Sequence, residues 1–164
     1  MTTQTRITIS GLKVAKFASE ETLCFSAKVA FDGVIFAAAS NDGHGGCTFV
    51  RALEGKSQRM ADAEAFAATI ATEKTFDGHL TDIVDDLVCA EDDRKTVERA
   101  FKRDMKSKVL FVRNGALSYF KIPRGVAVEK VVAHAHKKYP EAQLLNEMSP
   151  QAAWIVYSQM VGAA

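Results

Sequence analysis

The fold is decided by residues 25–39, which read FSAKVAFDGVIFAAA. Every second residue from Phe25 to Phe31 is apolar, and this alternation is typical of a strand that is buried on one face. Asp32-Gly33 then provides the two positive-φ positions of a type I′ turn. The stretch therefore predicts a β-hairpin whose return strand runs from Val34 to Ala39.

The tight turn also predicts which residues of this hairpin face each other. A two-residue turn pairs Phe31 with Val34 and Val29 with Phe36, so the two aromatic side chains share one face. We expect that face to be buried. A shorter strand is predicted before the hairpin, at residues 6–10, where the alternation ends at Gly11.

A second hairpin is predicted at residues 109–122, around another type I′ signal, Asn114-Gly115. Both of its faces are largely apolar. We therefore expect this hairpin to lie centrally in a sheet or to be covered on both sides.

Residues 58–106, between the two hairpins, form a predicted helical segment. Apolar residues recur there at helical spacing, most regularly from Leu80 to Val88. Ser57 is expected to cap a first helix, and Asp92 or Asp93 is expected to cap a later one.

Two more helices are predicted after the second hairpin. One carries an apolar stripe from Val128 to Tyr139, and the other begins at Ser149-Pro150. The last helix is expected to bury Trp154, Ile155, Tyr157 and Met160 or Val161. The chain is thus predicted to be a single α+β domain over residues 1–164, with a mainly antiparallel sheet built from two β-hairpins and about five helices.

Composition bounds the broad class of the protein. The chain has 164 residues, of which 48% are hydrophobic and 25% charged, so it can build a core. The net charge of +1 by itself predicts neither a nucleic-acid binder nor a membrane-surface protein. The first six residues lack the apolar segment of a secretory signal, and an odd number of cysteines without chelating spacing favours reduced thiols. We expect a cytoplasmic protein.

The most unusual local sequence is SNDGHGG, at residues 40–46. Its glycines allow sharp turns that present N–H groups outward, and such a concavity can hold a phosphate or a carboxylate. The alternative is a wide turn at a strand end, in which Asn41 and Asp42 make side-chain turns. The predicted ligand-binding residues are Asn41, Asp42, Gly43, His44, Gly45 and Gly46.

His44 could add a charge or a proton to this loop, and Asp42 could orient it. This pair is the basis for one alternative function, a small nucleotide or phosphoester hydrolase. A group formed by His79, Asp82 and Asp86 shares one helical face, but a solvated acidic face is the favoured interpretation. We predict no catalytic residue, no metal site and no cofactor.

Charge is segregated in the middle of the chain. Residues 77–93 hold seven acids and no Lys or Arg, whereas residues 94–108 hold seven bases and two acids. Arg99, Lys102, Arg103 and Lys106 lie at i, i+3, i+4 and i+7, which predicts one basic helical stripe. The stripe could meet an acidic protein surface or nucleic-acid phosphates. The alternative is that these charges only complement the helix dipole.

Six short motifs stand out along the chain: GLK at residues 11–13, FASEET at 17–22, FDG at 31–33, SNDGHGG at 40–46, LFV at 110–112 and LLNE at 144–147. Together they resemble a group of small bacteriophage proteins of no established function. The resemblance spans most of the chain and is sharpest over the first fifty residues.

This resemblance implies a phage accessory protein, made in the host cell and acting in host takeover or anti-defence. Such a protein would act by binding, and would either sequester a nucleotide signal or occlude a host defence protein. No catalytic residue follows from the resemblance. Nucleic-acid binding through the basic stripe is a further alternative, and a homo-oligomer is left open.

Overall fold

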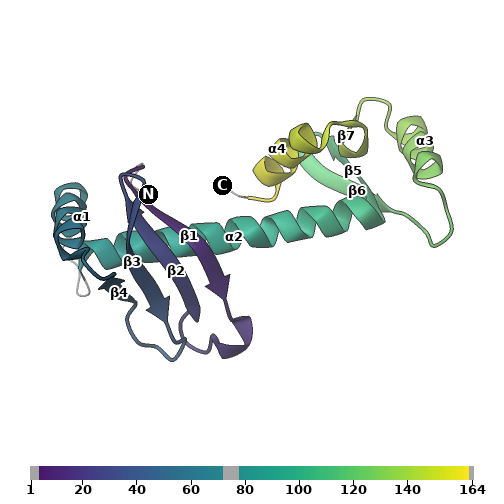
Figure 1. The fold of residues 1–164 in the computed structure, drawn as a ribbon. Helices are drawn as coiled ribbons and strands as arrows, with labels where there is room; N and C mark the ends of the chain where they lie inside the picture. Colours follow the sequence, from purple (N-terminus) through teal and green to yellow (C-terminus); the bar gives the residue numbers. More distant parts are fainter. Residues whose placement is uncertain (1–3, 72–77, 163–164) are drawn as a thin grey trace. The chain divides into compact units, whose positions relative to one another are not determined.

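The computed structural model describes residues 4–71 and 78–162. It confirms the α+β class, with four α-helices and seven strands in two antiparallel sheets among the described residues. The chain divides into two compact units, Met1–Asp92 and Asp93–Ala164. Where the sequence predicted a single domain, the two predicted hairpins belong to different sheets, one in each unit (Figure 1).

The N-terminal unit contains a four-stranded antiparallel sheet in the order β1-β2-β3-β4. The turn at Asp32 and Gly33 has φ angles of 49° and 76°, so the predicted hairpin between β2 and β3 is confirmed. A short 3₁₀ turn, η1 (Lys16–Ala18), follows the first strand. The strands are β1 (Ile7–Val14), β2 (Phe25–Phe31), β3 (Val34–Asn41) and β4 (Phe49–Ala52).

The pairing of β2 with β3 differs from the predicted register by one residue. Phe31 pairs with Val34 as predicted, but Val29 pairs with Ala37 because Phe36 forms a β-bulge. The side chains of Phe31 and Phe36 are both buried, as expected. The first strand also continues past its predicted end, because Gly11 adopts a φ of 64° within a second irregularity.

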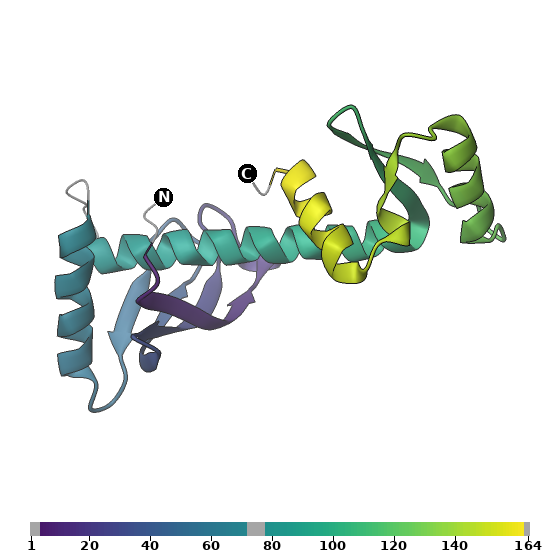
Figure 2. The same ribbon diagram turned by 90° about the horizontal axis from the view of Figure 1, so that it is seen from above.

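One face of this sheet packs against α1 (Ser57–Ile70) and against the first half of α2 (His79–Ser107), as Figure 2 shows. Ala63 and Ala67 of α1 are fully buried, and the predicted stripe of α2 buries Val84 and Val88 in the same core. The prediction that Ser57 caps α1 is wrong. Lys56 occupies the N-cap position, and no side chain there accepts a hydrogen bond.

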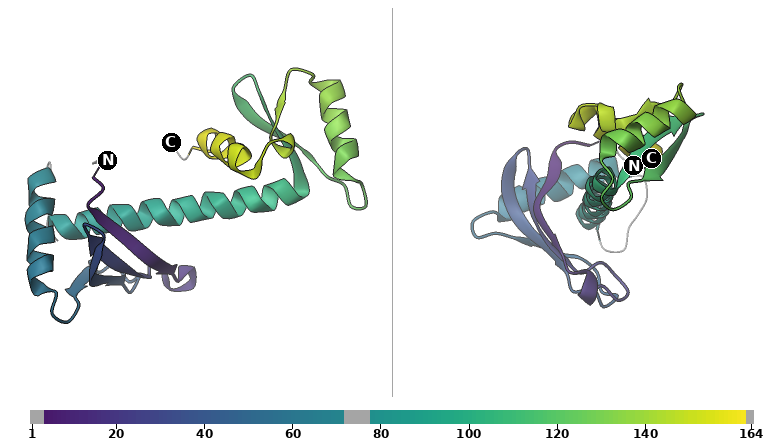
Figure 3. Two further views of the ribbon diagram at one scale, coloured as in Figure 1. Left: turned by 45° about the horizontal axis from the view of Figure 1, so that its top comes forward. Right: turned by 90° about the vertical axis from the view of Figure 1, so that its right-hand side faces the viewer.

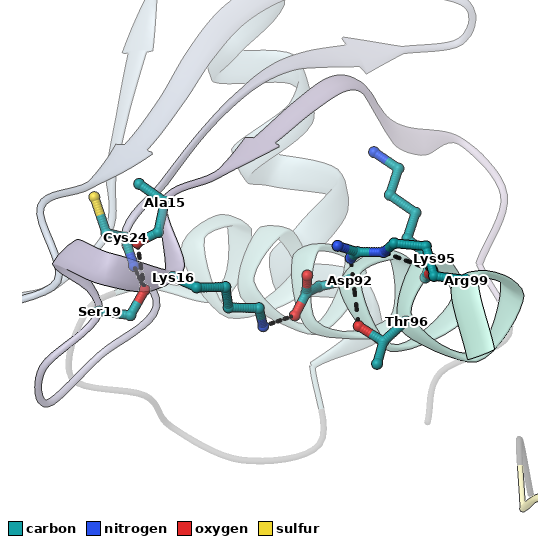
Figure 4. Close-up of polar contacts among 8 residues, drawn as sticks. All are labelled: Ala15, Lys16, Ser19, Cys24, Asp92, Lys95, Thr96 and Arg99. Atoms are coloured by element: carbon teal, nitrogen blue, oxygen red, sulfur yellow. Dashed lines mark hydrogen bonds and ion pairs between the residues drawn. The ribbon is translucent and has the colours of Figure 1, made fainter. Parts of the chain in front are cut away.

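Helix α2 is one continuous element of 29 residues, so the predicted break and cap at Asp92 or Asp93 are wrong. The helix continues because it contains neither glycine nor proline. Asp92 is instead 6% exposed and accepts a hydrogen bond from Lys16 Nζ at 2.5 Å (Figure 4). In the described parts of the chain, no helix joins sufficient length to sufficient apolar character to cross a membrane.

The C-terminal unit contains a three-stranded antiparallel sheet in the order β6-β5-β7 (Figure 3). The second predicted hairpin is confirmed, with positive φ angles at Asn114 and Gly115. A 3₁₀ turn, η2 (Leu145–Glu147), follows the last strand. The elements are β5 (Lys108–Arg113), β6 (Ala116–Lys121), α3 (Val128–Lys138), β7 (Gln143–Leu144) and α4 (Pro150–Met160).

The second hairpin is covered on both sides, as its apolar faces predicted. Val109 and Phe111 pack on one side, in a cluster with Val131 of α3. Leu110 packs on the other side, in a cluster with Phe101 of α2 and residues of α4. Strand β5 is therefore the centre of the sheet and of the core of this unit.

Helix α4 begins as predicted but buries a different set of residues. Ser149 Oγ accepts a hydrogen bond from the Ala152 N–H at 3.3 Å, which confirms the cap. Tyr157 is buried, whereas Ile155 is 52% exposed. Trp154 is partly buried, and both Met160 and Val161 are exposed, so the expected burial is only half right.

Candidate functional site

The glycine loop after β3 is organised by the side chain of Asn41, which is only 8% exposed. Its Oδ1 accepts hydrogen bonds from Thr22 Oγ1 at 2.8 Å and from the Gly43 N–H at 2.9 Å. Its Nδ2 donates to the Gly46 carbonyl at 2.9 Å and to Thr48 Oγ1 at 3.4 Å. Asn41 therefore closes the loop from the inside, and both polar atoms of its side chain have partners within the protein.

The backbone of the loop is packed closely on residues 18–24. The Gly43 carbonyl accepts hydrogen bonds from three successive N–H groups, those of Glu20, Glu21 and Thr22. A Cβ at Gly43 would lie 2.1 Å from the Ala18 carbonyl oxygen. Only glycine fits at this position, and the reason is packing within the protein.

Three of the loop N–H groups that could have held a phosphate already have acceptors. The Gly43 N–H donates to Asn41 Oδ1, the His44 N–H to Asp42 Oδ1 at 3.3 Å, and the Gly45 N–H to Thr22 Oγ1 at 3.3 Å. A phosphate would have to displace these bonds. The geometry favours the second interpretation of the loop, a turn that is stabilised by its Asn and Asp side chains.

The structure does not bring the side chains of His44 and Asp42 together as an acid–base pair. His44 Nδ1 instead lies 3.3 Å from Glu20 Oε2, and both side chains are more than half exposed. Asp42 accepts from the His44 backbone rather than from its ring. Residues 4–71 and 78–162 contain no group of three His, Cys, Asp or Glu side chains that could hold a metal, so His79, Asp82 and Asp86 do not form one.

A cavity of about 450 Å³ lies beside the loop and is lined partly by Gly45, Gly46 and Cys47. On its α2 side lies the carboxylate of Asp85, which accepts a hydrogen bond from Thr48 Oγ1 at 2.6 Å. A carboxylate at this position disfavours a bound phosphate because like charges repel. The cavity therefore adds nothing to the case for a nucleotide site.

The predicted basic stripe on α2 is exposed but partly neutralised. Lys102 Nζ lies 2.5 Å from Glu98 Oε1, and Arg103 Nε lies 3.3 Å from Asp104 Oδ1. Arg99 donates to the Lys95 carbonyl and to Thr96 Oγ1 on its own helix (Figure 4). Lys106 has no ion pair among the described residues. Of the predicted acidic segment, Asp77 lies outside the described residues, and Asp92 is paired with Lys16.

The sheet of the N-terminal unit has a second face, which sequence reasoning missed. This face lies opposite the core, and its outward residues form three cross-strand rows. The rows are Thr8–Ala30–Ile35, Ser10–Lys28–Ala38–Arg51 and Lys13–Ser26–Ser40–Phe49. Except for Ala30, all of these residues are exposed. We call this surface the open sheet face.

The open sheet face carries three cations, Lys13, Lys28 and Arg51, and no acidic residue. In the described parts of the chain, none of the three forms an ion pair. Other cations of the same unit do, since Arg6 binds Asp32 at 2.6 Å and Lys16 binds Asp92. The open sheet face is therefore a surface of uncompensated positive charge.

One aromatic side chain also lies on this face. Phe49 is 51% exposed, and the guanidinium of Arg51, two residues further along β4, lies 5.6 Å from the centre of its ring. On the two central strands, Ser26, Ala38 and Ser40 are small, whereas Lys28 and Ile35 are larger. The face thus combines cations, hydroxyl groups and one ring.

The C-terminal unit shows how the remaining histidines are used. His136 Nε2 lies 2.9 Å from Glu147 Oε1, and the His134 ring packs edge-on against Phe120 at 5.2 Å. The two histidines therefore have separate partners.

Comparisons of the chain with models of protein families, with curated proteins and with solved structures found no match.

Proposed function

We propose that this protein acts by binding a nucleic acid on the open sheet face. The observation that carries the proposal is the charge of that face, which holds Lys13, Lys28 and Arg51 without any acid. The whole chain has 21 Lys and Arg against 20 Asp and Glu, so such a separation does not follow from composition. A polyanion is the partner that uncompensated cations fit best.

The spacing of the cations suits a chain of phosphates. Neighbouring strands lie about 4.8 Å apart, so Lys28 on β2 and Arg51 on β4, two strands away, start about 10 Å from each other. Long flexible side chains can bring their charged groups closer or further apart than this. Each cation can therefore meet a different phosphate, and the bound counterions of the nucleic acid are released.

The geometry supports the two other predicted sites less well. Three N–H groups of the glycine loop bond within the loop and its neighbours, and His44 lies beside Glu20 rather than Asp42, so the geometry supports nucleotide capture and hydrolysis less well. The basic stripe of α2 is partly neutralised by Glu98 and Asp104. The resemblance to small bacteriophage proteins supports a further part of the proposal, that binding serves an accessory role in an infected host cell.

The test is a binding titration of the purified protein with a fluorescently labelled mixed-sequence oligonucleotide, repeated at several salt concentrations. The variant is the triple substitution Lys13→Ala, Lys28→Ala and Arg51→Ala. The matched control removes three cations from the rival surface, at Arg99, Lys102 and Lys106. All six side chains are exposed, so neither variant disturbs a core.

We expect the triple variant of the open sheet face to bind far more weakly. Its slope of log K against log salt should fall by about 2 to 3, because three phosphate contacts are lost. The control should bind as the unsubstituted protein does. Equal binding by the unsubstituted protein and the first variant would refute the proposal, and loss of binding in the control alone would assign the function to the α2 stripe.

A further inference from the structure

We infer that the open sheet face takes a single strand rather than a duplex, and that Phe49 stacks on one of its bases. This inference rests on the proposed function and adds the form of nucleic acid and the residue that reads it. Three features of the face carry it: its width, its exposed ring and the small side chains of Ser26, Ala38 and Ser40.

The width of the face excludes entry into a groove. Four strands spaced about 4.8 Å apart span roughly 14 Å between the outer backbones, and side chains extend this further. The major groove of B-form DNA is about 12 Å wide and admits a helix or a two-stranded ribbon. The centre of a four-stranded sheet can therefore touch a duplex only at its phosphates, whereas a single strand can lay its bases on the sheet.

Phe49 provides the stacking surface. Its ring is half exposed at the start of β4, and it shares its cross-strand row with Ser40 and Ser26. Every base has a π-face, so stacking on an aromatic ring binds single strands without demanding one sequence. The guanidinium of Arg51 lies over the ring, 5.6 Å from its centre, and adds a second planar group and a phosphate partner in the same place.

The cations and small residues are arranged so that backbone and bases can bind together. Lys13 lies on β1 and Arg51 on β4, at the two sides of the face, while Ala38 and Ser40 lie on β3 between them. Ser26, Ala38 and Ser40 are too short to hold a base away from the sheet, and Lys28 on β2 can reach a phosphate from the middle of the face. The serine hydroxyls can donate to or accept from base edges, which needs unpaired bases.

The experiment measures the affinity for one oligonucleotide as a single strand and as a duplex with its complement, for Phe49→Ala and for a matched control. The control is Phe17→Ala, because Phe17 is 94% exposed on η1 and lies outside the open sheet face. Both replacements remove an aromatic ring from the surface, and because Phe49 is half buried, thermal unfolding of each variant checks that it is folded at the temperature of the binding assay.

We expect tighter binding of the single strand. Phe49→Ala should weaken it by roughly 5- to 150-fold, the effect of losing one stacked base. Duplex binding and the salt slope should stay unchanged, since no phosphate contact is removed. Phe17→Ala should leave all values unchanged.

Equal affinity for both forms, or equal effects of the two substitutions, would overturn the inference. If the triple cation variant still abolishes binding in that case, the proposed function stands without it. If neither form binds the unsubstituted protein, the proposed function itself fails.

Discussion

Replacing Gly43 with alanine tests whether the glycine loop is a structural element of the N-terminal unit. Gly43 has a φ of 91°, a conformation that side-chain-bearing residues rarely adopt. An added Cβ would lie 2.1 Å from the Ala18 carbonyl oxygen and 2.9 Å from the Cys24 Cβ. Both distances are far below van der Waals contact, and the nearer atom belongs to the backbone.

The expected loss of stability has two sources. A residue with a Cβ pays about 1–2 kcal/mol in the left-handed region. The clash with the Ala18 carbonyl cannot be relieved by rotating a side chain, so the segment that donates to the Gly43 carbonyl must move away. Three backbone hydrogen bonds are at risk there, each worth about 1 kcal/mol. We expect Gly43→Ala to lower the free energy of unfolding by about 3–5 kcal/mol.

Urea and thermal unfolding, followed by circular dichroism, would measure this change against two matched glycines. Gly33 has a φ of 76° but nothing within 4 Å of an added Cβ, so Gly33→Ala should cost only the conformational part, about 1–2 kcal/mol. Gly46 has neither constraint, and Gly46→Ala should stay within about 0.5 kcal/mol. A Gly43 variant no less stable than the Gly33 variant would refute the packing argument.

Two further predictions concern polar groups inside each unit. Asn41→Ala should destabilise the protein by about 3 kcal/mol in urea unfolding, because four hydrogen bonds are lost at a buried site. The control Asp42→Ala, at an exposed site, should lower the stability by less than about 1 kcal/mol. Equal losses of stability would contradict the role given to Asn41. Burial raises the pKa of Asp104, but hydrogen bonds from Lys108 and Arg103 outweigh it and hold the pKa below its ordinary 3.8. Because the pKa is lower in the folded state, the ionised carboxylate stabilises the protein above pH 3.8, and this stabilisation is lost as the pH falls further. The difference in stability between the parent and Asp104→Asn should therefore close in acid unfolding curves. A difference that stays constant would exclude the ionised carboxylate as its cause.

The parts of the fold that the sequence predicted well are those with local causes. Asp32-Gly33 and Asn114-Gly115 each define a turn by their own backbone preferences, and Ser149 caps α4 through a bond to a residue three positions away. The continuous helix α2 was mispredicted because Asp92 looks like a cap in the sequence. Its carboxylate is used instead by Lys16, which lies 76 positions earlier in the chain.

The two candidate surfaces also differ in whether the local sequence reveals them. The stripe at Arg99 and Lys106 is visible in one stretch of helix, although its ion pairs are not. The open sheet face takes one cation from each of three strands, and Lys13 and Arg51 are far apart in sequence. Only the strand order and register show that they share a face. The alternation in the first hairpin could have placed Lys28 on the outer side of the sheet. It could not have shown which residues of the other strands lie beside Lys28.

The bulge at Phe36 explains why the residues beside Lys28 could not be predicted, and it determines which side chains the glycine loop and the open sheet face present. One extra residue in a strand reverses which side chains face the core from that point onward. In the predicted register, Ala38 and Ser40 would face the core and Asn41 would face solvent. With the bulge, Asn41 turns inward and closes the glycine loop, while Ala38 and Ser40 turn outward, beside Lys28 and Phe49. Residues 34–39 are all apolar, so no alternation in that stretch marks which register is correct.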